Sequence, residues 1–176
     1  ILAPSPLPEM VRRAAEGYPD LTLAGVPALW RAWHEARAIP PNVRLAISAG
    51  APLPLSLEQA VFAAAGLKIH NFYGSSECGG ITYDRTVTPR ADDACVGSAM
   101  QNVELALNED GCLQVRSSAV GQTYWPDGDD TLVGGCFQTS DLAGLRDGQV
   151  YLRGRLSDQI NVAGRKVSPA TIERAL

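Results

Sequence analysis

The sequence has no apolar run close to the roughly 20 residues that a membrane-spanning helix needs, and no basic and apolar signal segment opens it. Lysine and arginine are scattered and the net charge is −4, so the chain lacks the clustered basic charge typical of proteins that bind nucleic acid or anionic membranes. We therefore expect no membrane span, no nucleic-acid partner and a cytoplasmic location.

Potential metal ligands are sparse and poorly spaced. His34 and His70 form no cluster with the cysteines, which include no C-x-x-C pair and are predicted to be buried or half-exposed thiols. These cysteines are Cys78, Cys95, Cys112 and Cys136. Asp127, Asp129 and Asp130 lack the spacing of a calcium loop, which has a terminal bidentate glutamate, so they predict a solvated turn.

What is present is an ordinary globular composition, with 45% hydrophobic and 19% charged residues, and a first half that alternates helices with strands. A strand, a glycine-containing turn, a helix and a second strand within residues 43–73 predict a βαβ unit, and hence a parallel sheet with a right-handed crossover. Trp30 and Trp33, at helical spacing, are predicted to be core or sheet-packing residues, the alternative being a recognition surface. The expected helices are 9–15, 27–36 and 55–65, and the expected strands are 21–26, 43–48 and 67–73.

After about residue 90 the pattern changes to short strands separated by turn residues. Asp110-Gly111 separates the alternating runs 103–107 and 112–116, and Asp147-Gly148 precedes another run at 149–153. Asp-Gly between such runs is a hairpin signal. The sequence therefore predicts a mostly antiparallel, barrel-like subdomain.

Four ordered motifs carry a resemblance to a known family: Tyr-Gly-Ser-Ser-Glu at 73–77, Phe-Gln-Thr-Ser-Asp-Leu at 137–142, Gly-Arg-Leu-Ser-Asp-Gln-Ile at 154–160 and Gly-Arg-Lys-Val-Ser-Pro at 164–169. Together, and over roughly residues 43 to 176, they resemble the AMP-forming adenylate enzymes, which include acyl-CoA synthetases, peptide-synthetase adenylation domains and luciferases. Each motif alone would be a weak signal.

In that family the first motif supplies an aromatic ring that stacks on adenine, a hydroxyl that binds the α-phosphate and an acid that helps to hold magnesium. The resemblance assigns these roles to Tyr73, Ser76 and Glu77, with Ser76 and Glu77 as catalytic residues and Glu77 as the metal ligand. Gly74 lets the backbone approach a ligand, and a glutamate oxygen suits Mg²⁺. The alternative is a polar loop in which the glutamate is solvated or caps a helix.

A second nucleotide-binding turn is predicted at Ser-Ala-Gly-Ala-Pro, residues 48–52. It resembles the family's loop whose small residues form one face of the adenine slot, here Gly50, Ala51 and Pro52. Asn71, on the neighbouring strand, is a hypothesis for reading the adenine amino group. Both turns follow strands of the predicted sheet, whose carboxyl ends bind ligands. Taken alone, the 48–52 segment is only a βα turn.

The remaining motifs imply a ribose site and a hinge. Asp141 matches an aspartate that accepts hydrogen bonds from both ribose hydroxyls, although Ser140 replaces the usual glycine and puts the turn geometry in question. Arg155 would contact the ribose or a phosphate, and Ser157 occupies the pivot between adenylating and thioester-forming states. Ser168 would cap the first helix of a small C-terminal domain.

The predicted fold class is thus α/β, with a parallel βαβ portion at 1–90, a barrel-like subdomain at 91–156, and a hinge with the start of a C-terminal domain at 157–176. The resemblance implies ATP, AMP and Mg²⁺ as ligands, a small fatty or aromatic carboxylic acid as substrate, and coenzyme A or a carrier-protein phosphopantetheine as acceptor.

Two features that the family has are missing from the sequence: the phosphate loop that ends in lysine, and the catalytic lysine of the C-terminal domain. Because the chain also begins without methionine, we expect an internal piece of a larger ligase, inactive in isolation. The alternative is a non-catalytic module with a truncated fold that binds a nucleotide or an aromatic acid.

Overall fold

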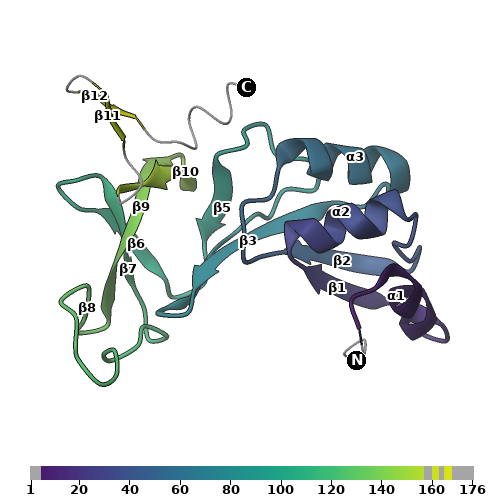
Figure 1. Cartoon of the computed structure of the whole chain (residues 1–176), viewed down its shortest axis with the longest axis horizontal. Helices are drawn as coiled ribbons and strands as arrows, with labels where there is room; N and C mark the ends of the chain where they lie inside the picture. The colour runs from purple at the N-terminus through teal and green to yellow at the C-terminus, as the bar shows by residue number, and fades with distance from the viewer. Residues whose placement is uncertain (1–4, 157–159, 163–164, 168–176) are drawn as a thin grey trace. The chain divides into compact units, whose positions relative to one another are not determined.

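A computed structural model (Figure 1) describes residues 5–156, 160–162 and 165–167. Two compact units are present, one made of Ile1–Phe72 with Asp84–Asp93 and the other of Tyr73–Tyr83 with Ala94–Leu176. Strand β3 (Ile69–Ser75) begins in the first unit and ends in the second. The domain division predicted at residues 91 and 157 stays a prediction.

The first unit is the predicted parallel sheet with its helices. It contains α1 (Pro8–Ala15), β1 (Leu21–Gly25), α2 (Pro27–Glu35), β2 (Val43–Ser48), α3 (Leu55–Ala65) and the start of β3. Strand β1 pairs with β2 in parallel, and β2 pairs with β3 in parallel. The βαβ prediction is confirmed.

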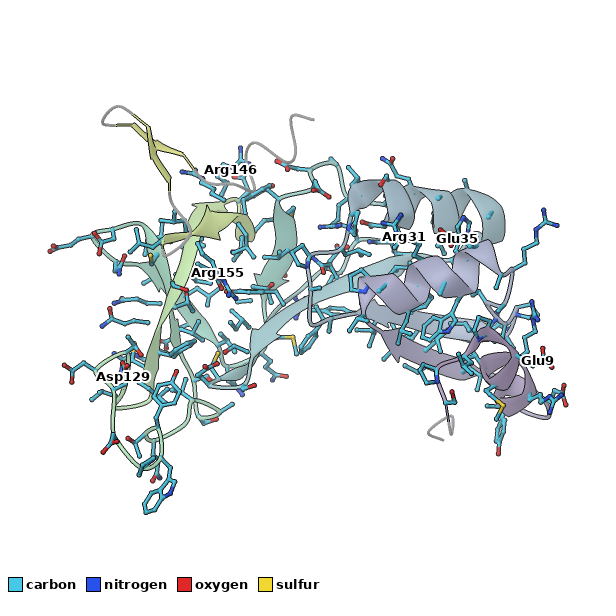
Figure 2. All side chains as sticks on the ribbon, viewed as in Figure 1. Glu9, Arg31, Glu35, Asp129, Arg146 and Arg155 are labelled. Carbon is cyan, nitrogen blue, oxygen red and sulfur yellow. The ribbon has the colours of Figure 1, made fainter. Side chains whose placement is uncertain are left out.

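Helix α2 is amphipathic. Arg31 and Glu35 lie on its exposed face (Figure 2), whereas Trp30 and Trp33 are 0% and 2% exposed and pack edge to face. The indole nitrogen of Trp30 donates to the carbonyl of Ile47 at 3.0 Å, so its one polar atom is satisfied. The prediction that both tryptophans belong to the core is confirmed.

The second unit is built almost entirely from antiparallel strands. Their hydrogen-bonded order runs from β4 (Gly79–Tyr83) through β5 (Cys95–Ala99), β10 (Gln149–Arg155), β9 (Cys136–Arg146) and β7 (Cys112–Arg116) to β6 (Glu104–Leu107), with β8 (Leu132–Val133) beside β9. Both predicted hairpins form, and Asp147 and Gly148 each have the positive φ that a two-residue turn of this kind requires. The sheet is open rather than closed, so the expected barrel-like character is limited to its antiparallel pairing.

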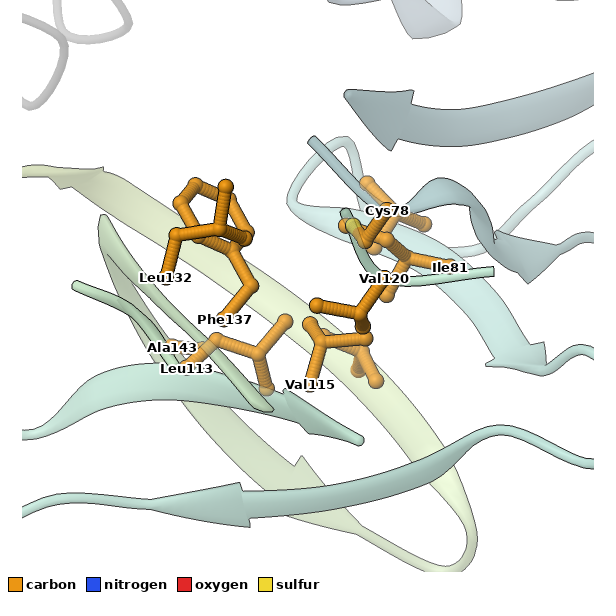
Figure 3. Packing of buried hydrophobic residues seen from close by; sticks show 10 residues of the cluster. Cys78, Ile81, Leu113, Val115, Val120, Leu132, Phe137 and Ala143 are labelled. Atoms are coloured by element: carbon orange, nitrogen blue, oxygen red, sulfur yellow. The ribbon is translucent and has the colours of Figure 1, made fainter. Parts of the chain in front are cut away.

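A hydrophobic cluster fills the second unit (Figure 3). Leu113 and Val115 of β7, Ile81 of β4 and Val150 of β10 are almost completely buried in it. Cys78 and Cys112 are buried, Cys95 and Cys136 are partly exposed, and all four are free thiols, as the sequence predicts. None of the described helices is long and apolar enough to cross a bilayer.

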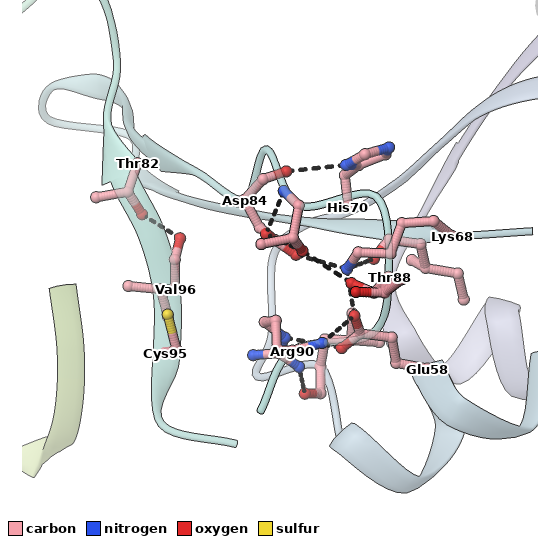
Figure 4. A network of polar contacts seen from close by, with 12 residues as sticks. Glu58, Lys68, His70, Thr82, Asp84, Thr88, Arg90, Cys95 and Val96 are labelled. Carbon is pink, nitrogen blue, oxygen red and sulfur yellow. Dashed lines mark hydrogen bonds and ion pairs between the residues drawn. The ribbon is translucent and has the colours of Figure 1, made fainter. Parts of the chain in front are cut away.

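Residues 84–93 return to the first unit through a group of buried charges that the sequence did not reveal (Figure 4). Lys68 donates to the carboxylates of Glu58 and Asp84, and Arg90 donates its Nε–H to Glu58 Oε2 at 2.7 Å. None of the four side chains is more than 6% exposed. Strand β3 begins at Ile69, directly after Lys68, and not at Leu67 as expected.

A two-stranded hairpin, β11 (Ile160–Val162) with β12 (Arg165–Val167), follows β10. The predicted pivot Ser157 and the predicted start of the C-terminal domain at Gly164 and Ser168 lie outside the described residues.

Candidate functional site

The Tyr-Gly-Ser-Ser-Glu motif occupies the end of β3 and the tight turn into β4. Gly74 is required by the strand itself, because a Cβ atom there would lie 2.4 Å from the carbonyl oxygen of Gly79 on β4. Ser76 is exposed, and Tyr73 and Glu77 are half-buried. The turn therefore presents a hydroxyl to solvent between two anchored side chains.

Tyr73, Asp141 and Arg155 form one hydrogen-bonded group. The Tyr73 hydroxyl donates to Asp141 Oδ2 at 2.5 Å, and Arg155 Nε donates to Asp141 Oδ1 at 2.9 Å. Asp141 and Arg155 are register partners on β9 and β10, so the sheet itself places them together (Figure 2 labels Arg155). Burial, then the hydrogen bond to Asp141 and its negative charge, raise the pKa of Tyr73 well above its ordinary value. Tyr73 therefore remains a neutral donor.

The backbone at Asp141 is fixed from within the sheet. Its N–H donates to Thr139 Oγ1 at 3.1 Å, and Thr139, 7% exposed, donates its hydroxyl to the carbonyl of Leu113 at 2.9 Å. Ser140 lies within β9 and is not among the described residues with positive φ. The serine in place of glycine therefore leaves the local geometry unstrained, which removes the doubt raised by the sequence.

Glu77 is held by a segment 44 to 47 residues away, in the loop between β7 and β8. The N–H of Gly121 donates to the backbone carbonyl of Glu77 at 2.7 Å, and the Tyr124 hydroxyl donates to Glu77 Oε1 at 3.1 Å. Hydrogen bonds from its own backbone N–H, from Ser75 and from Tyr124 lower the pKa of Glu77 and outweigh the opposing effect of partial burial. Glu77 is therefore ionised at neutral pH.

In the first unit, the predicted adenine-side residues lie at the carboxyl ends of the parallel strands. Gly50, Ala51 and Pro52 are exposed in the turn after β2. Asn71 on β3 is 4% exposed and is the register partner of Ser48 on β2. Ser48 is fully buried, and its Oγ has no hydrogen-bond partner among the described residues.

A sequence profile described as "AMP-binding enzyme" matches residues 3–125. The chain belongs to this family. The match includes the turn at 50–52, Asn71, the motif at 73–77 and Tyr124, whereas Asp141 and Arg155 lie beyond it.

Individual AMP-binding enzymes show the same likeness. The chain is 31% identical to an anthranilate–CoA ligase of Pseudomonas aeruginosa over an alignment 188 residues long, which covers 97% of this chain and 36% of the relative. The chain thus spans about a third of the length of that protein.

Solved structures of family members share the fold. An O-succinylbenzoate coenzyme A synthetase of Bacillus subtilis, in complex with ATP and magnesium ion, superposes with a TM-score of 0.81 at 21% identity, over 95% of this chain and 38% of that one. The anthranilate CoA ligase AuaEII, in complex with anthranoyl-AMP, gives a TM-score of 0.78 at 22% identity, over 98% and 36%.

The family motifs account for only part of what surrounds the candidate residues. Sequence reasoning named Tyr73, Asp141 and Arg155, and the structure joins them. It missed Tyr124 and did not predict the hydrogen bond that the Asp141 N–H donates to Thr139. No local pattern marks Tyr124, because its contact with Glu77 joins residues that are 47 positions apart in the sequence.

Those aspartates form the solvated turn that was predicted. Asp127, Asp129 and Asp130 are exposed, and Asp129 Oδ1 accepts hydrogen bonds from the N–H and hydroxyl of Thr131 at 2.7 and 2.6 Å. Hydrogen bonds from the Thr131 hydroxyl and N–H lower the pKa of Asp129. Within the described part of the chain, no three His, Cys, Asp or Glu residues form a group that could hold a metal.

Proposed function

We propose that the full-length protein is an AMP-forming ligase that joins a small carboxylic acid to AMP, with release of pyrophosphate, and then passes the acyl group to the thiol of coenzyme A. The observation that carries the proposal is the hydrogen-bonded group of Tyr73, Asp141 and Arg155, together with family membership. A carrier-protein thiol as the acceptor and a cytoplasmic location stay predictions.

The residues present fit an adenine nucleotide. One Asp141 oxygen accepts a hydrogen bond from Tyr73 and the other accepts one from Arg155, and each has a second lone pair, so the carboxylate retains two acceptor sites for the two hydroxyls of a ribose. Tyr73 is held by its hydroxyl, so the orientation of its ring is fixed before adenine arrives. Arg155, whose side chain is 62% exposed, is a planar, permanently charged donor suited to a ribose or phosphate oxygen.

The residues also fit a magnesium ion that arrives with ATP. Mg²⁺ in nucleotide enzymes is bound through one or two carboxylates together with phosphate oxygens and water, and so does not need a cage of protein ligands. Glu77 is the ionised carboxylate for this role, and Ser76 beside it is an exposed hydroxyl for the α-phosphate. Bound Mg²⁺ would supply positive charge where phosphate charge develops.

We further propose an aromatic carboxylic acid as the substrate. The support is the 31% identity to an anthranilate–CoA ligase, an enzyme named for an aromatic acid. Fatty acids are the alternative class that the sequence motifs allow.

Pyrophosphate exchange into ATP by the full-length protein tests the proposal, with anthranilate, benzoate and a medium-chain fatty acid supplied in turn. Exchange should require both Mg²⁺ and a carboxylic acid, and should be fastest with an aromatic acid. The isolated 176-residue chain should give none. If ATP binds but no acid supports exchange, the protein is a nucleotide-binding module and the ligase proposal is wrong.

A further inference from the structure

Glu77, the carboxylate proposed to bind magnesium, is hydrogen-bonded to a loop that has no assigned role. Tyr124 lies in the segment between β7 and β8, and its hydroxyl reaches Glu77 Oε1 at 3.1 Å. Three residues earlier, the N–H of Gly121 donates to the backbone carbonyl of Glu77 at 2.7 Å. The same short segment thus holds both the main chain and the side chain of Glu77.

The Tyr124 ring is anchored independently of that hydrogen bond. It packs against the hydrophobic cluster of the second unit, which includes Leu132 and Phe137. The next residue, Trp125, is 92% exposed, so the chain turns Tyr124 inward and Trp125 outward. Because packing fixes the ring, the Tyr124 hydroxyl is held in one position, whereas the hydroxyl of a flexible surface residue would not be.

This arrangement orients Glu77 without using up its ability to bind a cation. A glutamate has three rotatable side-chain bonds, and a metal site must immobilise them at a cost in entropy. The structure already restricts them through Tyr124, and a carboxylate with about four acceptor positions keeps others for a ligand. The donor is neutral, so the negative charge of Glu77 is retained.

We propose that Tyr124 is a positioning residue for Glu77, and that its hydroxyl sets the affinity of the ATP-bound enzyme for Mg²⁺. This inference rests on the proposed function, because it assigns Tyr124 to a metal ligand of the ATP site. The phenol touches neither substrate nor metal and acts through the carboxylate alone.

The test is Tyr124→Phe in the full-length protein, since phenylalanine keeps the packed ring and removes only the hydroxyl. ATP binding is titrated by calorimetry at a series of Mg²⁺ concentrations, and again in EDTA. The Mg²⁺ concentration for half-maximal enhancement of ATP binding should rise about threefold to tenfold, the effect of losing one hydrogen bond, while binding in EDTA stays within about twofold.

Tyr151→Phe is the matched control. Tyr151 is a half-buried tyrosine of the same unit whose ring packs under the guanidinium of Arg146 at 3.9 Å, so loss of its hydroxyl should leave the Mg²⁺ dependence unchanged. A double-mutant cycle completes the test. If Tyr124 acts through Glu77, then Tyr124→Phe should add little to the Mg²⁺ defect of Glu77→Gln, because the hydrogen-bonded carboxylate is already changed.

The outcomes separate this inference from the proposed function. A Tyr124→Phe protein that melts at a lower temperature but keeps the wild-type Mg²⁺ dependence would show that the tyrosine only secures the loop. An Mg²⁺ defect that adds fully to that of Glu77→Gln would show that Tyr124 does not act through Glu77, and would also overturn the inference. If wild-type ATP binding is itself independent of Mg²⁺, the assignment of Glu77 fails and the inference fails with it.

Discussion

Replacing Glu58 with glutamine should destabilise the protein far more than replacing Asp20 with asparagine. Each carboxylate accepts a hydrogen bond from an arginine Nε at the same distance of 2.7 Å, from Arg90 and Arg44 respectively. The pairs differ in their surroundings. Glu58 and Arg90 have side chains 0% and 2% exposed, whereas those of Asp20 and Arg44 are 64% and 70% exposed.

The size of the effect follows from the donors that face Glu58. Lys68 Nζ and the Arg90 N–H point at Oε1, and Arg90 Nε points at Oε2 (Figure 4). A glutamine must direct its own NH₂ group at one of these donors, whichever way the amide is turned, and it leaves a buried positive charge uncompensated. Breaking a buried ion pair in this way costs about 3–5 kcal/mol. The exposed pair, screened by water, is worth about 0–1 kcal/mol.

Urea denaturation of both variants of the full-length protein gives the two free-energy changes, and hydrogen exchange of the α3 amides localises the Glu58 effect to the first unit. Losses that agree within about 1 kcal/mol would refute the reasoning, because burial would then not decide what an ion pair contributes. A Glu58→Gln loss that is large but absent from α3 would refute the assignment to this group of charges.

Further predictions concern the site, the acid range of stability and the hinge. Asp141→Ala should weaken ATP binding at least tenfold and leave acid binding nearly unchanged when each ligand is titrated by calorimetry, because it removes charge-assisted acceptors from the ribose. Burial raises the pKa of Asp84, but hydrogen bonds from Lys68 and Thr86 outweigh burial and lower that pKa below the ordinary aspartate value. Ionised Asp84 therefore stabilises the folded protein above the ordinary aspartate pKa, and this stabilisation is lost as the pH falls through the lower pKa of the folded state. Asp84→Asn should therefore flatten the fall in urea stability below about pH 4. Ser157→Pro should change pyrophosphate exchange and acyl transfer by different factors, because proline fixes φ at a predicted pivot.

The elements of the first unit could be predicted closely because local signals and hydrophobic periodicity agree there. Pro27 starts α2, and Gly66, with φ of 63°, ends α3 where the sequence places the end. Strands β4 and β5 were missed. Their residues, 79–83 and 95–99, include three glycines and little apolar alternation, so their pairing depends on partners distant in the chain.

Polar partnerships were harder to predict than elements. Glu58, Lys68, Asp84 and Arg90 look like ordinary surface charges on a linear sequence, and nothing in their spacing indicates that they are buried together. The same holds for Tyr124, which lies 47 residues from the carboxylate it contacts. A motif identifies the carboxylates of a site, whereas the groups that orient them are set by tertiary packing.

The donors on the two site carboxylates differ in a way that matches their proposed ligands. Tyr124 and Ser75, whose side chains donate hydrogen bonds to Glu77, are neutral, so neither brings a positive charge that would oppose a divalent cation. Asp141 shares its charge with Arg155 as well as bonding Tyr73, which suits a neutral ribose diol that needs acceptor lone pairs and no net charge. The positive charge of Arg155 also acts on Glu77 and helps to lower its pKa. A neutral partner such as the Tyr124 phenol orients Glu77 without adding to that positive charge, which suits a carboxylate that is to bind a cation.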